Sequence, residues 1–372
     1  MQTTEERQRN PWLHRFHIDG PLLFALVCLS LTSLFVVYSA SGEDLAMMER
    51  QAMRIGLSYL AMLVVAQIPS LTVVRWSAPM YLLGLLLLVA VLVMGEIGKG
   101  AQRWLDIGIM TIQPSELMKL AVPMMMAWFI AKQGMPPTFS RILGGLLLIT
   151  APTLLIAKQP DLGTSLLIAC SGIFVLFLSG LSWRLVAVSV GALSAFAPVL
   201  WMFLMHDYQR QRVLTFLNPE RDPLGSGYHI IQSKIAIGSG GIEGKGWLQG
   251  TQSQLEFLPE RHTDFIFAVF SEEFGLMGVS LLLLLYGFVI FRGMIIANRA
   301  QDTYGKLLAG SLTLTFFVYV FVNIGMVSGL LPVVGVPLPL ISYGGTSMVT
   351  LMAGFGLLMA IATHRRLVMR KE

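Results

Sequence analysis

Residues Phe274–Phe291 read FGLMGVSLLLLLYGFVIF and contain no charged side chain. A transmembrane helix needs about 20 consecutive apolar residues, and a stretch of this length meets that requirement. It therefore predicts a helix that crosses a membrane.

The rest of the chain repeats this pattern. Of its 372 residues 55% are hydrophobic and 13% charged, whereas about a quarter of the residues in a soluble domain are charged. Other uncharged runs are Gly20–Gly42, Ile55–Val74, Trp76–Gly95, Ile142–Ala157, Leu162–Trp183 and Leu185–Met205. Leu120–Ala131 becomes a span if Glu116 and Lys119 are included, and Leu307–Thr363 is long enough for two helices around a Gly/Pro-rich hairpin. We expect a single all-α membrane domain, residues 1–372, with about ten transmembrane helices.

Lysine and arginine predict the orientation, because cytoplasmic loops are enriched in them. With the N-terminus inside, fourteen of these residues fall in cytoplasmic segments and five in the short loops opposite. Residues 1–19 and 364–372 are then cytoplasmic, and the large loop 206–265 is periplasmic. The net charge of +5 is a topology signal and predicts no nucleic-acid partner.

Charged residues that lie next to apolar runs are the candidates for a site. Gln113-Pro114-Ser115-Glu116 has the pattern of a helix start, and Glu116 can pair with Lys119 three residues later. A membrane ion pair is either a closure of the helix end or part of a functional site. Arg103 is either an interfacial anchor or a cavity residue, and Asp161 either caps the next helix or lines the cavity.

The large loop contains further candidates. Arg210, Arg212, Lys234 and Lys245 share it with the glycines of Gly238-Ser239-Gly240-Gly241 and Gly244-Lys245-Gly246, whose backbone N–H groups could approach an anion. Residues Tyr228–Ile237 are amphipathic and predict a short helix on the membrane surface. A Gly-rich loop is more commonly a flexible linker, so its proximity to basic residues is what favours a phosphate site.

Asp264 lies directly before the apolar run Phe265–Phe270. Partial desolvation there would raise the pKa of the carboxyl group, which could then accept a proton from a sugar hydroxyl. The alternative is an ordinary N-cap for the eighth span, supplied by Thr263 or Asp264. Residues 327–345 are apolar but interrupted by Pro and Gly, so we expect a re-entrant hairpin that forms one wall of a cavity shared with Glu116 and Asp264.

Several motifs together resemble the SEDS family (shape, elongation, division and sporulation). They are Ala101-Gln102-Arg103-Trp104, Gln113-Pro114-Ser115-Glu116, QPDLGT at residues 159–164, HTDFIF at 262–267 and PLPLISYGG at 337–345. Residues Gly250–His262 and Val333–Pro337 resemble the elongation branch of the family. The resemblance covers nearly the whole chain.

The resemblance implies a peptidoglycan glycosyltransferase of the bacterial inner membrane that polymerises lipid II during cell elongation and rod-shape maintenance, releasing undecaprenyl diphosphate on the periplasmic side. Asp264 matches the family's catalytic aspartate, with the role of a general base. Arg210, Arg212, Lys234 and Lys119 are candidates to hold the diphosphate, on which negative charge develops.

The partners implied are lipid II, the lipid-linked nascent glycan, membrane lipids, a class B penicillin-binding protein transpeptidase and other elongation-complex proteins. The family permits a divalent cation, Mg²⁺ or Mn²⁺, although the sequence contains no dedicated metal cage. Two other functions stay open: a lipid II flippase, and a membrane scaffold for the wall-elongation complex.

Overall fold

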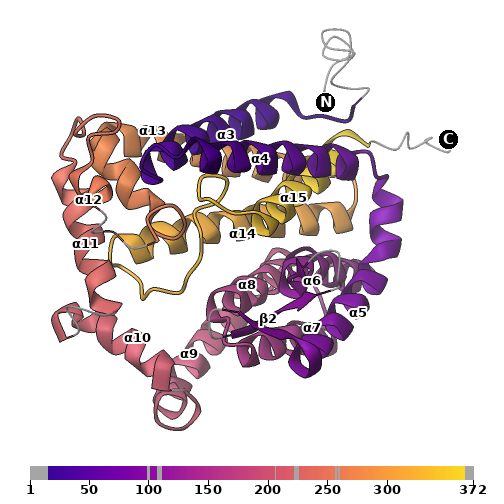
Figure 1. Ribbon diagram of the computed structural model, residues 1–372. Helices are drawn as coiled ribbons and strands as arrows, with labels where there is room; N and C mark the ends of the chain where they lie inside the picture. Colours follow the sequence, from indigo (N-terminus) through magenta and orange to yellow (C-terminus); the bar gives the residue numbers. More distant parts are fainter. Residues whose placement is uncertain are drawn as a thin grey trace.

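The computed structural model describes residues 16–98, 101–106, 111–205, 207–221, 226–255, 258 and 260–364. Within these residues ten long helices form the body of the protein (Figure 1). They are α3 (Gly20–Ala40), α4 (Leu45–Ala66), α5 (Ser70–Met94), α6 (Pro114–Ala131), α7 (Phe139–Lys158), α8 (Leu162–Leu178), α9 (Trp183–Val199), α13 (Ile266–Arg299), α14 (Thr303–Val327) and α15 (Thr346–Thr363). The large loop contains α10 (Asp207–Leu217), η2 (Pro219–Arg221), α11 (Ser226–Ser239) and α12 (Thr251–Gln254).

Seven helices of the described chain are long and apolar enough to cross a membrane. These are α3, α5, α7, α13, α14, α15, and α9 together with the π-helical segment η1 (Leu200–Leu204) that continues it. The other three complete the ten that the sequence predicts: α4 and α6 carry charges within the helix, and α8 is 17 residues long. The expectation of an all-α polytopic membrane protein is confirmed.

The boundaries of the second helix differ from the prediction. The uncharged run Ile55–Val74 suggested a span there, whereas α4 ends at Ala66 and α5 begins at Ser70. Arg50 and Arg54 lie within α4, so a search for uncharged runs starts the helix too late. Pro69 then separates the two helices, which places Arg75 inside α5.

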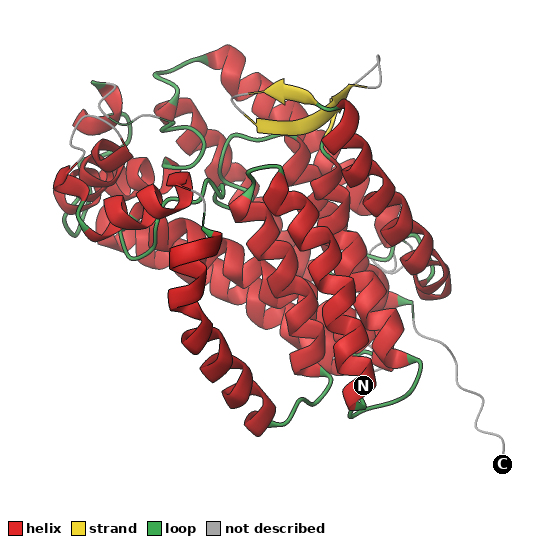
Figure 2. Ribbon diagram, turned by 90° about the horizontal axis from the view of Figure 1, so that it is seen from below, coloured by secondary structure: helices red, strands yellow, loops and turns green. Residues whose placement is uncertain are grey.

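Three short strands, which the sequence did not predict, follow α5. Strands β1 (Glu96–Gly98), β2 (Ala101–Asp106) and β3 (Thr111–Ile112) form an antiparallel sheet in the order β1-β2-β3. Trp104 pairs with Glu96, and Leu105 pairs with Ile112. The sheet lies at the end of the helical bundle opposite to the chain ends labelled N and C (Figure 2).

The helices form two groups, each with its own hydrophobic core. One contains α3, α4, α13, α14 and α15, and the other contains α5, α6, α7 and α8, at the lower right of Figure 1. Buried residues of α14 and α15 join the second core as well, so these two helices connect the groups. Among the described side chains of its most apolar stretch, the segment α9–η1 has no buried residue, and it stands outside both cores.

The predicted hairpin between α14 and α15 is present as a non-helical segment, residues 328–345. Val336, Leu338 and Ile341 are each at most 2% exposed, so the segment lies inside the protein. Irregular backbone at membrane depth requires such enclosure, because its polar groups have no water to bond.

Candidate functional site

Asp264 lies in a segment that is held through its backbone carbonyl groups. The carbonyl of His262 accepts a hydrogen bond from Tyr343 N at 2.8 Å, and that of Thr263 accepts one from Ser342 Oγ at 2.6 Å. The carbonyl of Asp264 itself accepts from Asn323 Nδ2 at 2.9 Å. Three consecutive carbonyls are therefore fixed by groups from α14 and the hairpin.

The side chain of Asp264 does not cap a helix. Helix α13 begins at Ile266 with Phe265 as its N-cap and has no side-chain capping bond. The Asp264 carboxylate instead lies beside Gly335 of the hairpin, with Oδ2 3.5 Å from the point where a Cβ would stand. Gly335 has a φ of +73°, a conformation that favours glycine. The ordinary capping role thus does not account for this acid.

A second polar cluster lies at the start of α6. Lys119 Nζ donates to Glu116 Oε1 at 2.6 Å, as the sequence predicted, and lies 5.4 Å from the ring centroid of Tyr319 on α14. Pro114 occupies the first turn of the helix and Glu116 lies in that turn. Glu116 Oε2 and the Tyr319 hydroxyl are buried and have no hydrogen-bond partner among the described residues.

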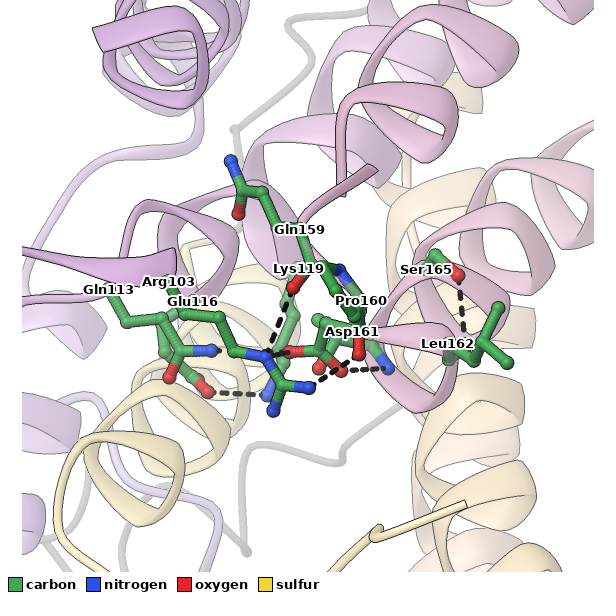
Figure 3. A network of polar contacts seen from close by, with 10 residues as sticks. Arg103, Gln113, Glu116, Lys119, Gln159, Pro160, Asp161, Leu162 and Ser165 are labelled. Atoms are coloured by element: carbon green, nitrogen blue, oxygen red, sulfur yellow. Dashed lines mark hydrogen bonds and ion pairs between the residues drawn. The ribbon is translucent and has the colours of Figure 1, made fainter. Parts of the chain in front are cut away.

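Arg103 and Asp161 extend this cluster (Figure 3). Asp161 caps α8 by accepting from Thr164 N at 3.1 Å, and its Oδ2 lies 3.8 Å from Arg103 Nε. Gln113 Nε2 also donates to Asp161 Oδ2, at 3.4 Å. Arg103 further donates to the carbonyls of Gln159 and Pro160, so it braces the α7–α8 turn. The capping role that the sequence offered for Asp161 is therefore observed, and its carboxylate also has Arg103 and Gln113 as polar partners.

Residues 334–336 of the hairpin lie between Asp264 and this second cluster. A Cβ on Gly163, in the first turn of α8, would meet Val334 O at 2.8 Å and Val336 Cγ2 at 2.9 Å. Gly335, between these two valines, faces Asp264. Residues 334–336 therefore contact α8 beside Asp161 and contact the Asp264 carboxylate as well.

Helix α11 of the large loop packs beside Asp264. The ring of His229 stacks on Phe265 with centroids 5.7 Å apart, and Ser233 Oγ donates to Val327 O at 2.8 Å. Burial lowers the pKa of His229, while the negative charge of Glu260 acts in the opposite direction. Lys234 is exposed, and its Nζ lies 2.8 Å from the Cβ position of Gly329, where the hairpin begins.

The other basic candidates lie elsewhere in the loop. Arg210 donates to the carbonyls of Trp201 and Met202, each at 2.9 Å, and so caps the segment η1. Lys245 pairs with Glu272 of α13 at 2.7 Å. Arg212 is half-buried on α10. The structure brings Arg103, Glu116, Lys119 and Asp161 together, places Lys234 against the hairpin, and gives Arg210 and Lys245 partners within the protein.

Three amides of the Gly-rich segment that we expected to face an anion are instead bonded within the protein, which contradicts their part in the predicted anion site. The amides of Gly244, Lys245 and Gly246 donate to the carbonyls of Gly240, Glu272 and Glu273 at 2.9 to 3.0 Å. The segment docks on α13 where that helix is broken at Gly275, with φ 60° and ψ −163°. These glycines permit backbone to lie against backbone.

Sequence reasoning missed several polar residues of the site. Asn323 and Tyr319 lie on the mostly apolar helix α14. Away from Asp264, Glu272 and Glu273 are at most 1% exposed within α13. A polar group inside a membrane helix is a functional signal in itself, so Asn323 could have been singled out. Its partners, 59 and 13 residues away, could not have been named.

The described residues contain no group of three or more His, Cys, Asp or Glu side chains that could hold a metal ion. The Mg²⁺ or Mn²⁺ that the family permits therefore has no cage of these side chains in the described part of the chain.

Comparison with known proteins agrees with this architecture. A family model described as cell cycle protein, covering FtsW, RodA and SpoVE, matches residues 20–367. The peptidoglycan glycosyltransferase MrdB of Escherichia coli K12 is 59% identical over 365 residues, which cover 98% of this chain and 99% of MrdB. The protein belongs to the FtsW/RodA/SpoVE family, the SEDS family that the motifs indicated.

Two solved structures share the fold. A chain from a study of how a peptidoglycan synthase complex coordinates polymerisation and crosslinking is 35% identical, with a TM-score of 0.80, and the match covers 92% of this chain and 97% of that one. The rod shape determining protein RodA of Thermus thermophilus is 28% identical, with a TM-score of 0.69, over 92% of this chain and 96% of its own. MrdB and RodA agree with the elongation branch expected from the sequence.

Proposed function

We propose that this protein is a peptidoglycan glycosyltransferase that polymerises lipid II during cell elongation, with Asp264 as the general base. The observation that carries the proposal is the placement of Asp264: its carboxylate does not cap a helix and lies against a hairpin whose residues also contact the start of α8, beside Asp161. Relatives of the same family are named peptidoglycan glycosyltransferases.

The reaction requires a proton acceptor and a site for the leaving group. The 4-hydroxyl of the acceptor lipid II attacks the anomeric carbon of the lipid-linked donor. Asp264 accepts the hydroxyl proton as the new glycosidic bond forms, and the bond from the anomeric carbon to the diphosphate oxygen breaks with inversion. Undecaprenyl diphosphate leaves with the electron pair of that bond.

Among the basic candidates, Lys234 is best placed to meet the diphosphate. Its amine is exposed beside the hairpin, and the described residues offer it no ion-pair partner. The cluster at α6 is different, because Arg103 and Lys119 are balanced there by Asp161 and Glu116. We assign that neutral cluster to orienting the sugar and peptide parts of the substrate, and Lys234 to stabilising the charge on the leaving group.

The same proposal includes the side of the membrane on which polymerisation occurs and the partner protein. The bias of lysine and arginine along the chain favours a periplasmic large loop with both termini in the cytoplasm. A class B penicillin-binding protein would then receive the new strand on the same side for crosslinking.

The test compares purified wild-type protein with Asp264→Asn on fluorescent lipid II, with and without the transpeptidase. We expect glycan polymer from the wild type and a loss of about 10²- to 10⁴-fold in the variant, the usual contribution of a general base. Asp302→Asn is the matched control, since Asp302 caps α14 by accepting from Gly305 N and asparagine caps helices equally well.

Equal polymerisation by wild type and Asp264→Asn would remove Asp264 from the mechanism. Lipid scrambling by the wild type without polymer under any condition would favour the flippase. If the protein shows neither polymerisation nor lipid scrambling but still binds the transpeptidase, the scaffold function is favoured.

A further inference from the structure

The side chain of Asn323 is fully buried in α14 and makes two hydrogen bonds outside its own helix. Its Nδ2 donates to Asp264 O at 2.9 Å and to Val336 O at 2.7 Å. Both partners are carbonyl oxygens, which only accept hydrogen bonds, so the amide nitrogen and not the oxygen must face them. The orientation of this side chain is therefore fixed by chemistry.

The two carbonyls belong to the two sides of one contact. Asp264 carries the carboxylate, and Val336 follows Gly335, the residue against which Oδ2 of that carboxylate lies. The NH₂ group of Asn323 thus fixes the position of Asp264 relative to the hairpin at Gly335, which the Asp264 carboxylate faces. Ser342 Oγ and Tyr343 N bond the two preceding carbonyls, so the segment is fixed on one side throughout.

The arrangement leaves a polar atom without a bond. Asn323 Oδ1 is buried and has no hydrogen-bond partner within the described chain. A buried unsatisfied polar atom costs free energy, and an apolar side chain of similar size would avoid that cost but leave the carbonyls of Asp264 and Val336 without this donor. The two donated bonds are the contribution that only a primary amide makes here.

We propose that Asn323 is a positioning residue for the Asp264 carboxylate, holding the general base at its working distance from the hairpin wall. This inference rests on the proposed function and deepens it. Asn323 does not touch the substrate and acts through Asp264. We call the two hydrogen bonds from Asn323 Nδ2 the clamp. Displacement of a reacting group by about 1 Å can lower a rate about 100-fold, so loss of the clamp should lower kcat and leave KM nearly unchanged.

The kinetic test uses Asn323→Leu, which removes both donors at similar size. We expect kcat for lipid II polymerisation to fall about 10- to 100-fold, with KM within about twofold of wild type. Ser311→Ala is the matched control: Ser311 lies on the same helix, is fully buried and donates to Ser171 O at 2.6 Å, outside the Asp264 segment. We expect its kcat to stay within about twofold.

A double variant separates positioning from general damage. In the Asp264→Asn background, Asn323→Leu should lower the residual rate no further, because the group it positions is already absent. A full 10-fold further loss in that background, or an unchanged kcat in the single variant, would overturn the inference.

Hydrogen exchange tests the clamp without relying on activity. We expect Asn323→Leu to accelerate amide exchange in peptides covering residues 260–268 and 336–343, and Ser311→Ala to leave both unchanged. If the wild type made no polymer, the proposed function would fail and the exchange result would still decide the clamp. Equal exchange in Asn323→Leu and wild type would reject it.

Discussion

At the scale of single residues, the buried ion pair between Glu116 and Lys119 can contribute to the stability of the protein, to its activity, or to both. About a tenth of each side chain is exposed, and the pair is 2.6 Å apart. Loss of one partner leaves the other charge buried without compensation, which costs about 3 to 5 kcal/mol, whereas loss of both is often neutral. Stability and activity should therefore respond differently to single and double substitutions.

We predict that Lys119→Met lowers the stability of the protein and that adding Glu116→Gln restores it, while polymerisation stays impaired in both. Thermal unfolding in detergent gives the first quantity, and the lipid II assay gives the second. Recovery of activity along with stability would mean that the pair is a scaffold closing the helix end.

The residues that sequence reasoning found are those with partners close in the chain. Glu116 and Lys119 are three positions apart, and Asp161 caps the helix that follows it, so local rules suffice. Asp264 was recognisable by its position and its motif. The contacts of Asn323 and Ser342 join segments 59 and 79 residues apart, and no local pattern encodes such contacts.

At the scale of elements, the break in α13 shows how glycine is used in the large loop. Gly240 and Gly244 lie directly against the backbone of residues 271–274, where a Cβ would overlap it. Gly241 has a positive φ of 57° but open space around its Cβ position. The two kinds of glycine allow conformational strain and close packing to be measured separately.

We predict that Gly244→Ala destabilises the protein more than Gly241→Ala. The latter should cost about 1 to 2 kcal/mol for a left-handed conformation, and the former adds about 1 to 3 kcal/mol for overpacking against Glu273 and Phe274. Thermal or denaturant unfolding of the two variants measures the difference. Equal loss in both would show that the loop moves away from α13 without cost.

The sequence predicted the number and order of the long helices well, because a bilayer imposes a length on every apolar run. It misplaced α4, whose charges lie inside the helix, and it missed the strands, which are too short for a periodic pattern. It also assigned the Gly-rich segment to an anion, because the alternative partner, the backbone of α13, becomes adjacent only in the folded chain.

At the scale of the whole molecule, the two ends of the described chain meet. The rings of His17 and His364 stack with centroids 3.8 Å apart, and His17 Nδ1 lies 3.2 Å from Thr363 Oγ1. An even number of spans brings both ends to the same side of a membrane. The abundance of lysine and arginine near both ends is the basis on which we propose that this side is the cytoplasm.

We predict that a cysteine at Ile242, which is 67% exposed in the large loop, reacts with a membrane-impermeant maleimide in intact spheroplasts. A cysteine at the exposed Ser140, in the first turn of α7, should react only after lysis. Both variants are made in a chain with Cys28 and Cys170 replaced by alanine, and that parent is the control. The reverse labelling pattern would invert the topology.

The three hydrogen bonds that hold the carbonyls of residues 262–264 form at different times during synthesis of the protein. A ribosome delivers α13 to the membrane before α14, and Ser342 and Tyr343 emerge only after both. The carbonyls of Thr263 and His262 thus stay without these partners until residues 342 and 343 have been synthesised, whereas Asn323, the partner of the Asp264 carbonyl, arrives with α14. A chain that stops before residue 342 can insert most of its helices and still lack two of the three contacts that hold the segment around Asp264.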